Sequence, residues 1–95
     1  MNRDFDVLDA TTLISFDELC RASGVDVTWV EEMIAHGVVS PTADGPRYTA
    51  LSITRIRKAR RLEQDFSLNA PGVALALDLL DEIERLRARL GRGGR

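Results

Sequence analysis

The amino-acid sequence predicts a small, mainly α-helical domain, a winged helix-turn-helix with a small β-hairpin wing and a long C-terminal helix. Two observations lead to this fold. Two short helical segments flank a tight turn at Gly24, which is the pattern of a helix-turn-helix. A turn-rich segment between two short β-prone runs follows, and then two long stretches with apolar residues at helical spacing. The 95 residues suffice for one domain and leave little room for an enclosed catalytic pocket.

The first predicted helix covers about residues 16–23. Ser15 and Glu18 form a capping-box pattern, in which each side chain accepts a hydrogen bond from the other residue's backbone N–H. Gly24 ends the helix, because glycine readily takes the left-handed conformation favoured just past a helix. The run at residues 12–14 suits a short strand before it.

The second predicted helix covers about residues 27–36. Asp26 is a suitable N-cap residue, and Gly37 ends the helix. Its inward side is expected to carry Val30, Met33 and Ile34, because these residues recur at helical spacing.

The wing is expected between the second and third helices. Residues 38–40 are interpreted as one strand, residues 41–46 as a turn, and residues 47–49 as the returning strand of a β-hairpin. We expect Thr49 to cap the third helix, which covers about residues 50–66.

The C-terminal half consists mainly of two helices. The third carries a basic run on its polar face, from Arg55 to Arg61. After a short link, Asn69 can cap a fourth helix that has Pro71 in its first turn and runs to about Leu90. Residues 1–11 are expected to form a flexible N-terminal arm, and the Gly- and Arg-rich residues 91–95 a disordered tail.

The composition argues against an enzyme and against a metal or cofactor site. The chain has one cysteine, Cys20, and one histidine, His36, which cannot by themselves form a structural zinc site. Cys20 lies on the apolar side of the first helix, where a buried thiol is expected. The acidic N-terminus is not a signal peptide, and no apolar run approaches the roughly 20 residues that span a bilayer, so we expect a cytoplasmic protein.

The charge is unevenly distributed along the chain. Residues 1–46 have a net charge of −7 and residues 47–95 a net charge of +5. The second predicted helix carries Glu31 and Glu32 and no Lys or Arg. A helix that reads DNA needs cations beside the phosphates, so an acidic helix here favours a basic partner.

The sequence also resembles known families. Gly37-Val38-Val39-Ser40-Pro41, Gly45-Pro46-Arg47-Tyr48-Thr49 and the following long helix resemble the MerR-type winged helix-turn-helix over residues 12–66. The segment Asn69-Ala70-Pro71-Gly72-Val73-Ala74-Leu75-Ala76-Leu77-Asp78-Leu79-Leu80-Asp81-Glu82-Ile83 resembles the chaperone modulator CbpM family. That resemblance implies a protein that binds and inhibits the J-domain of the DnaJ-like co-chaperone CbpA.

The two inferences together predict a partner-binding site on the helix-turn-helix. A J-domain uses a basic helix to engage its Hsp70, and an acidic surface could cover that helix and compete with the Hsp70. We expect the electrostatic part of the site to consist of Asp17, Glu18, Glu31 and Glu32, and Trp29 to be its apolar anchor. The alternative for the four carboxylates is that they form an ordinary solvent-exposed surface that binds no partner. The alternative for Trp29 is that its side chain belongs to the core.

The fourth helix predicts a homodimer. Its apolar residues exceed what a small domain can cover, and MerR-type proteins dimerise through a helix after the winged domain. We expect residues 67–90 to pack and dimerise through Leu79, Leu80, Ile83, Leu86 and Leu90. The alternative is that this helix folds back onto its own domain.

A second function remains open from the sequence, that of a MerR-like DNA-binding transcriptional regulator. In that case Arg47 and the basic run of the third helix would contact the phosphates. Arg–Glu pairing at helical spacing is the other explanation of that run.

Overall fold

The computed structural model describes residues 11–43 and 45–93. The chain forms two short strands and four helices in the order β1 (Leu13–Ser15), α2 (Phe16–Ser23), α3 (Val27–Ala35), β2 (Arg47–Thr49), α4 (Leu51–Phe66) and α5 (Ala70–Gly93). The mainly helical fold with a helix-turn-helix and a long C-terminal helix is confirmed. Residues 1–10 of the expected N-terminal arm (1–11) and residues 94–95 of the expected tail lie outside the described residues.

Local signals set both ends of α2. The Ser15 side chain accepts from the Glu18 N–H, and the Glu18 carboxylate accepts from the Ser15 N–H, so the predicted capping box is present. Gly24 has φ 72° and donates its N–H to the Cys20 carbonyl. The left-handed backbone at Gly24 turns the chain into α3, as the sequence predicts.

The helix α3 begins after Asp26, as predicted, although the Asp26 side chain makes no capping hydrogen bond. The Asp26 carbonyl accepts from the Val30 N–H at 3.0 Å. Val30 and Met33 are fully buried and Ile34 packs against the core, so the predicted inward side is confirmed.

The small antiparallel sheet is present, but its strand pairing corrects the predicted hairpin. Ile14 in β1 pairs with Tyr48 in β2, and no strand forms at residues 38–40. Val38 and Val39 are both buried, whereas neighbouring residues of a strand point to opposite faces. Both valines instead pack into the core, and β1 supplies the pairing partner of β2.

Two predictions about helix ends are also wrong. Thr49 belongs to β2, so Ala50 occupies the N-cap position of α4 instead. Alanine has no polar side chain, so this helix end has no side-chain cap. The helix α5 continues to Gly93, although residues 91–95 were expected to be disordered. Each added turn extends an existing helix, and arginine is both a good helix former and a favourable cation near a C-terminus.

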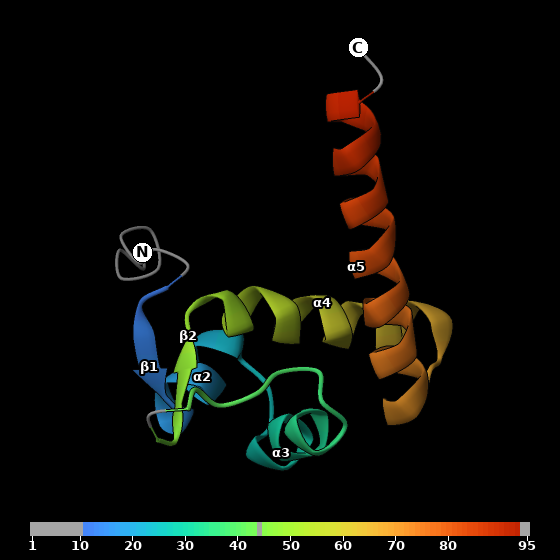
Figure 1. The fold of residues 1–95 in the computed structure, drawn as a ribbon. Coiled ribbons are helices and arrows are strands. Elements are labelled where there is room, and N and C mark those ends of the chain that lie inside the picture. Colours follow the sequence, from blue (N-terminus) through green and yellow to red (C-terminus); the bar gives the residue numbers. More distant parts are fainter. Residues whose placement is uncertain (1–10, 44, 94–95) are drawn as a thin grey trace, which may run out of the picture.

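The core lies where α2, α3, α4 and the first turns of α5 meet. Its fully buried large side chains come from each of these helices: Leu19, Val30, Met33, Ile56, Val73 and Leu77. Asn69 caps α5, with its Oδ1 accepting from the Gly72 N–H at 2.9 Å. Beyond Leu77, α5 stands out from the rest of the molecule (Figure 1), and none of its residues 78–91 is buried. Over the described residues, α5 therefore does not fold back onto its own domain.

Candidate functional site

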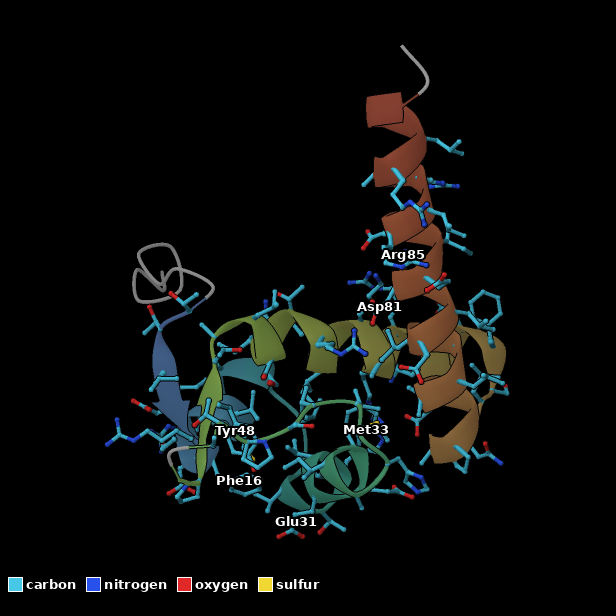
Figure 2. All side chains as sticks on the ribbon, in the orientation of Figure 1. Phe16, Glu31, Met33, Tyr48, Asp81 and Arg85 are labelled. Carbon is cyan, nitrogen blue, oxygen red and sulfur yellow. The ribbon has the colours of Figure 1, made fainter. Side chains whose placement is uncertain are left out.

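The predicted carboxylates all lie on the surface of the helix-turn-helix. Asp17 and Glu18 are exposed in the first turn of α2, and Glu31 and Glu32 are exposed in the second half of α3. Figure 2 shows Glu31 on the outer side of α3, pointing away from the other elements. The buried side of α3 carries Val30 and Met33, so the acidic residues occupy the side left to solvent. We call Asp17, Glu18, Glu31 and Glu32 the acidic face.

The carboxylates from the two helices lie close enough to act on one group. The pKa of the Cys20 thiol is raised, first by burial and then by the negative charges of Asp17 and Glu31. Asp17 is on α2 and Glu31 is on α3, so the Cys20 thiol lies within the electrostatic reach of carboxylates from both helices. The tertiary structure thus joins charges that stand 14 positions apart in the sequence into one negative region.

Glu18 belongs to the acidic face and also caps the N-terminus of α2. Its Oε1 accepts a hydrogen bond from the Ser15 N–H at 2.7 Å, and its own N–H donates to the Ser15 Oγ at 3.1 Å. Hydrogen bonds to the carboxylate from the Ser15 backbone and side chain, with weaker contributions from Arg21 and Arg47, lower the pKa of the Glu18 carboxyl. The Glu18 carboxylate therefore stays ionised. Its position is fixed by the cap of α2, and the positive charges of Arg21 and Arg47 act on it.

Trp29 lies on the side of α3 that faces α4. Its indole N–H donates to the Glu63 carboxylate at 3.0 Å, and the Arg60 guanidinium lies 5.5 Å from its ring centroid. Trp29 is half-buried and packs against the core. At about 100° per residue, Trp29 is separated from Glu31 by roughly 160° around the helix but from Glu32 by only about 60°. It therefore adjoins the acidic face at Glu32 alone.

An exposed apolar residue on α3 escaped the sequence analysis. Val27 opens the helix and is 49% exposed, one turn before Glu31. Its spacing of three from Val30 places it near the inward side, and only the tertiary structure shows that nothing covers this first turn. The i, i+4 relation to Glu31 was the signal that could have identified it, because such residues share a helix face. Val27 adds an apolar group beside the acidic face.

The basic side chains of α4 are largely engaged within the chain. Arg55 donates from Nε to the Val38 carbonyl at 2.6 Å, and Arg57 donates to the Ala22 carbonyl at 2.9 Å. Arg60 forms an ion pair with Glu63 at 2.6 Å. The predicted Arg–Glu pairing is confirmed for Arg60. The tertiary contacts of Arg55 and Arg57 tie α4 to the loop after α3 and to the end of α2, which leaves fewer cations for phosphates.

The described residues offer no cluster that could serve as a metal centre. Among residues 11–43 and 45–93, no group of three or more His, Cys, Asp or Glu side chains is placed to hold a metal ion. Cys20 is free and buried, and its raised pKa keeps the thiol protonated. No helix in the described part of the chain is both long and apolar enough to cross a membrane.

The predicted dimer residues lie along the outstanding part of α5. Leu79, Ile83, Leu86 and Leu90 are exposed to 55, 43, 43 and 72%, respectively, and Leu80 is half-buried. The structure therefore leaves this apolar row uncovered by the chain's own domain. Whether a second copy covers it remains a prediction at this point.

Comparison with known proteins identifies the relatives of this fold. Residues 14–92 match the family described as MerR HTH family regulatory protein. The chain is 33% identical to the chaperone modulatory protein CbpM of Pseudomonas entomophila, with 90% of this chain and 96% of that protein aligned. The chain belongs to the CbpM family of MerR-type proteins. The CbpM protein of Coxiella burnetii is 31% identical, over 88% of this chain and 82% of its own length.

Membership in the CbpM family agrees with the shape of the site. The aligned relatives span the helix-turn-helix and most of α5, so the similarity is not limited to a shared DNA-binding motif. The name of these relatives describes modulators of a chaperone. Such a role is regulatory, and the exposed acidic face is a surface suited to contact another macromolecule.

Proposed function

We propose that this chain binds the J-domain of a DnaJ-like co-chaperone of the CbpA type through the acidic face and inhibits its co-chaperone activity. One observation carries the proposal. Exposed carboxylates lie on both α2 and α3, with Asp17 and Glu31 both raising the pKa of the Cys20 thiol, on a helix-turn-helix whose α3 has no Lys or Arg. The names of the relatives place them in chaperone regulation, and the CbpM resemblance indicates the J-domain as the partner.

The proposed mechanism is competition for a basic helix. The J-domain presents cations to its Hsp70, and the acidic face offers four carboxylates to the same cations. Opposite potentials speed the encounter, and they weaken as salt screens them over a Debye length of about 8 Å at physiological ionic strength. While the acidic face covers the helix, the J-domain cannot stimulate the Hsp70 ATPase.

Val27 and Trp29 flank the acidic face and supply apolar area. Val27 lies one turn from Glu31 and is exposed, whereas Trp29 is half-buried beside Glu32. Hot spots in protein interfaces concentrate in apolar and aromatic anchors surrounded by polar residues. The charges would therefore steer the J-domain, and these two side chains would hold it.

The test is a charge reversal with a matched control. Glu31→Lys turns an attraction into a repulsion, which at surface dielectric should weaken J-domain binding on the order of tenfold at low salt. Asp65→Lys changes the net charge equally on α4, where Asp65 is exposed, and should leave the affinity unchanged. Titration calorimetry with an isolated J-domain measures both, and J-domain-stimulated ATPase activity measures inhibition. Equal affinities for the two variants and the parent chain would contradict the proposal.

DNA binding is the second candidate, and the exposed Arg47 and Arg61 are the observation in its favour. Against it stand the acidic α3 and the intramolecular contacts of Arg55, Arg57 and Arg60. We expect no gel shift with duplex DNA at low salt, where phosphate contacts are strongest. A shift that disappears in Arg61→Ala would instead favour a DNA-binding regulator.

A further inference from the structure

The side of α4 turned away from the core carries four side chains that belong neither to the core nor to the acidic face. Leu51, Thr54, Lys58 and Arg61 follow one another at intervals of three, four and three residues. That spacing places them on one side of the helix, opposite its buried residues. We call these four residues the outer line of α4.

The two cations of the outer line are available to a ligand. Arg61 is exposed and Lys58 is half-buried. Arg60, one position before Arg61, instead pairs with Glu63. Within the part of the chain that the structure describes, no carboxylate forms an ion pair with Lys58 or Arg61. The outer line therefore presents two uncompensated positive charges to solvent.

The N-terminal end of the outer line is apolar and uncovered. Leu51 is 56% exposed, and Leu13 in β1 is 42% exposed. Leu13 pairs with Thr49, so both leucines lie near the start of α4. The Ala50 N–H donates to the Thr12 carbonyl at 2.8 Å. The chain that precedes Thr12 therefore begins beside this apolar end.

The sequence before the described residues has the complementary chemistry. Residues 4–9 are Asp-Phe-Asp-Val-Leu-Asp, with three carboxylates, three apolar side chains and no base. In an extended segment alternate residues share one side, which would place Asp4, Asp6 and Leu8 together. Their order is acid, acid, leucine. The outer line, followed from its C-terminal end, offers cation, cation, leucine.

The spacings of the two sets of side chains also agree. Leu8 and Asp4 are separated by about 13 Å in an extended chain, at roughly 3.3 Å per residue. Leu51 and Arg61 are separated by about 15 Å along the helix, at 1.5 Å per residue. The three residues between Leu8 and Thr12 span up to about 13 Å, which allows the chain to turn from β1 onto α4.

We propose that residues 4–8 bind along the outer line of the same chain, in place of the flexible arm that the composition alone favours. The register is Leu8 on Leu51, Asp6 at Lys58 and Asp4 at Arg61. A short tether gives the segment an effective concentration on the order of millimolar, so weak ion pairs suffice to populate the contact. Salt weakens the contact by screening these pairs.

The bound segment would act as an internal competitor of polyanions. Its carboxylates occupy the two cations that would otherwise neutralise phosphates on this side of α4. The inference does not depend on the proposed function, because it uses no residue of the acidic face.

Paramagnetic relaxation in the full chain tests the register. Asn2→Cys in a Cys20→Ala background carries a nitroxide six residues before Leu8, about 20 Å farther along an extended segment. The proposed register takes this label to the last turn of α4. We expect the amide signals of residues 61–66 to broaden most at low salt and to recover at high salt. Broadening centred on Ala50, where the segment is tethered, would show an outer line open to an external polyanion and overturn the proposal.

A charge swap separates the proposed pair from a general effect of charge. Asp6→Lys and Lys58→Asp should each reduce the broadening of residues 61–66, and the double variant should restore it. Asp9→Lys is the matched control, because it changes the net charge equally but lies on the other side of an extended segment. We expect this control to keep the broadening. An equal loss in Asp9→Lys and Asp6→Lys, or no recovery in the double variant, would contradict the register.

A mixed sample tests whether the contact forms within one chain. An isotope-labelled chain without the nitroxide is mixed with an unlabelled chain that carries it. We expect no broadening of residues 61–66 in this sample, because each segment binds its own α4. Broadening there would assign the segment to a second copy and refute the intrachain contact.

Discussion

Arg55 on α4 and Asp81 on α5 form an ion pair with a separation of 2.9 Å between Nη1 and Oδ2. The same guanidinium donates from Nε to the Val38 carbonyl at 2.6 Å. One side chain therefore joins the loop after α3, the helix α4 and the base of the outstanding part of α5. This relationship links α5 to α4 just beyond the part of α5 that is buried in the core, and no local sequence pattern predicts it.

The two contacts of Arg55 should differ in their contribution to stability. We expect Arg55→Ala to lower the free energy of unfolding by about 1–2 kcal/mol, because it leaves the partly buried Val38 carbonyl without its charged donor. Asp81→Ala should cost less than about 1 kcal/mol, because that carboxylate is half exposed to solvent. Urea denaturation measures both. An equal loss in the two variants would show that the ion pair, not the carbonyl, is the important contact.

The capping box makes the stability of α2 dependent on pH. Hydrogen bonds from Ser15 lower the pKa of Glu18 in the folded state. A lowered pKa stabilises the folded chain above the unfolded pKa of a glutamate, and that contribution is lost as the pH falls through the folded pKa. We expect Glu18→Gln to be less stable than the parent chain at pH 7, with the difference shrinking toward pH 3. Thermal unfolding at a series of pH values tests this, and a constant difference would contradict it.

Two neighbouring leucines in the first turns of α5 should respond differently to truncation. Leu77 is fully buried, and Leu77→Ala should destabilise the fold by about 3 kcal/mol through lost contacts and a cavity. Leu75 is 60% exposed two residues earlier, and Leu75→Ala should change stability by less than about 0.5 kcal/mol. Chemical denaturation of the two variants compares them directly. A large effect at Leu75 would mean that another chain covers it.

Trp29 can be assigned to the interface or to the positioning of α3 by two substitutions. Trp29→Phe keeps an aromatic ring but loses the hydrogen bond to Glu63, and Trp29→Ala loses both. If the ring anchors a J-domain, Trp29→Phe should bind within a few-fold of the parent chain and Trp29→Ala on the order of tenfold or more weaker. Stability is measured alongside by denaturation. A loss of binding that follows the loss of stability in both variants would identify Trp29 as a positioning residue.

The sequence by itself determined the helices, most of their boundaries and the chemistry of their surfaces. The Ser15–Glu18 capping box, the left-handed turn at Gly24 and the Asn69 cap all formed as predicted, because each depends on hydrogen bonds or backbone preferences within four residues. The apolar periodicity of α3 likewise marked Val30 and Met33 for the core. The absence of Lys and Arg from residues 27–35, which form α3, is evident from the sequence alone.

Only the tertiary structure decided what depends on contacts between distant segments. Ile14 pairs with Tyr48 in place of the expected hairpin with residues 38–40, while Val38 and Val39 both pack into the core. The common effect of Asp17 and Glu31 on the Cys20 thiol follows from the core that α2 and α3 share with α4. Local propensity cannot encode such relationships, because strand pairing and helix packing are set by which side chains fill one common core.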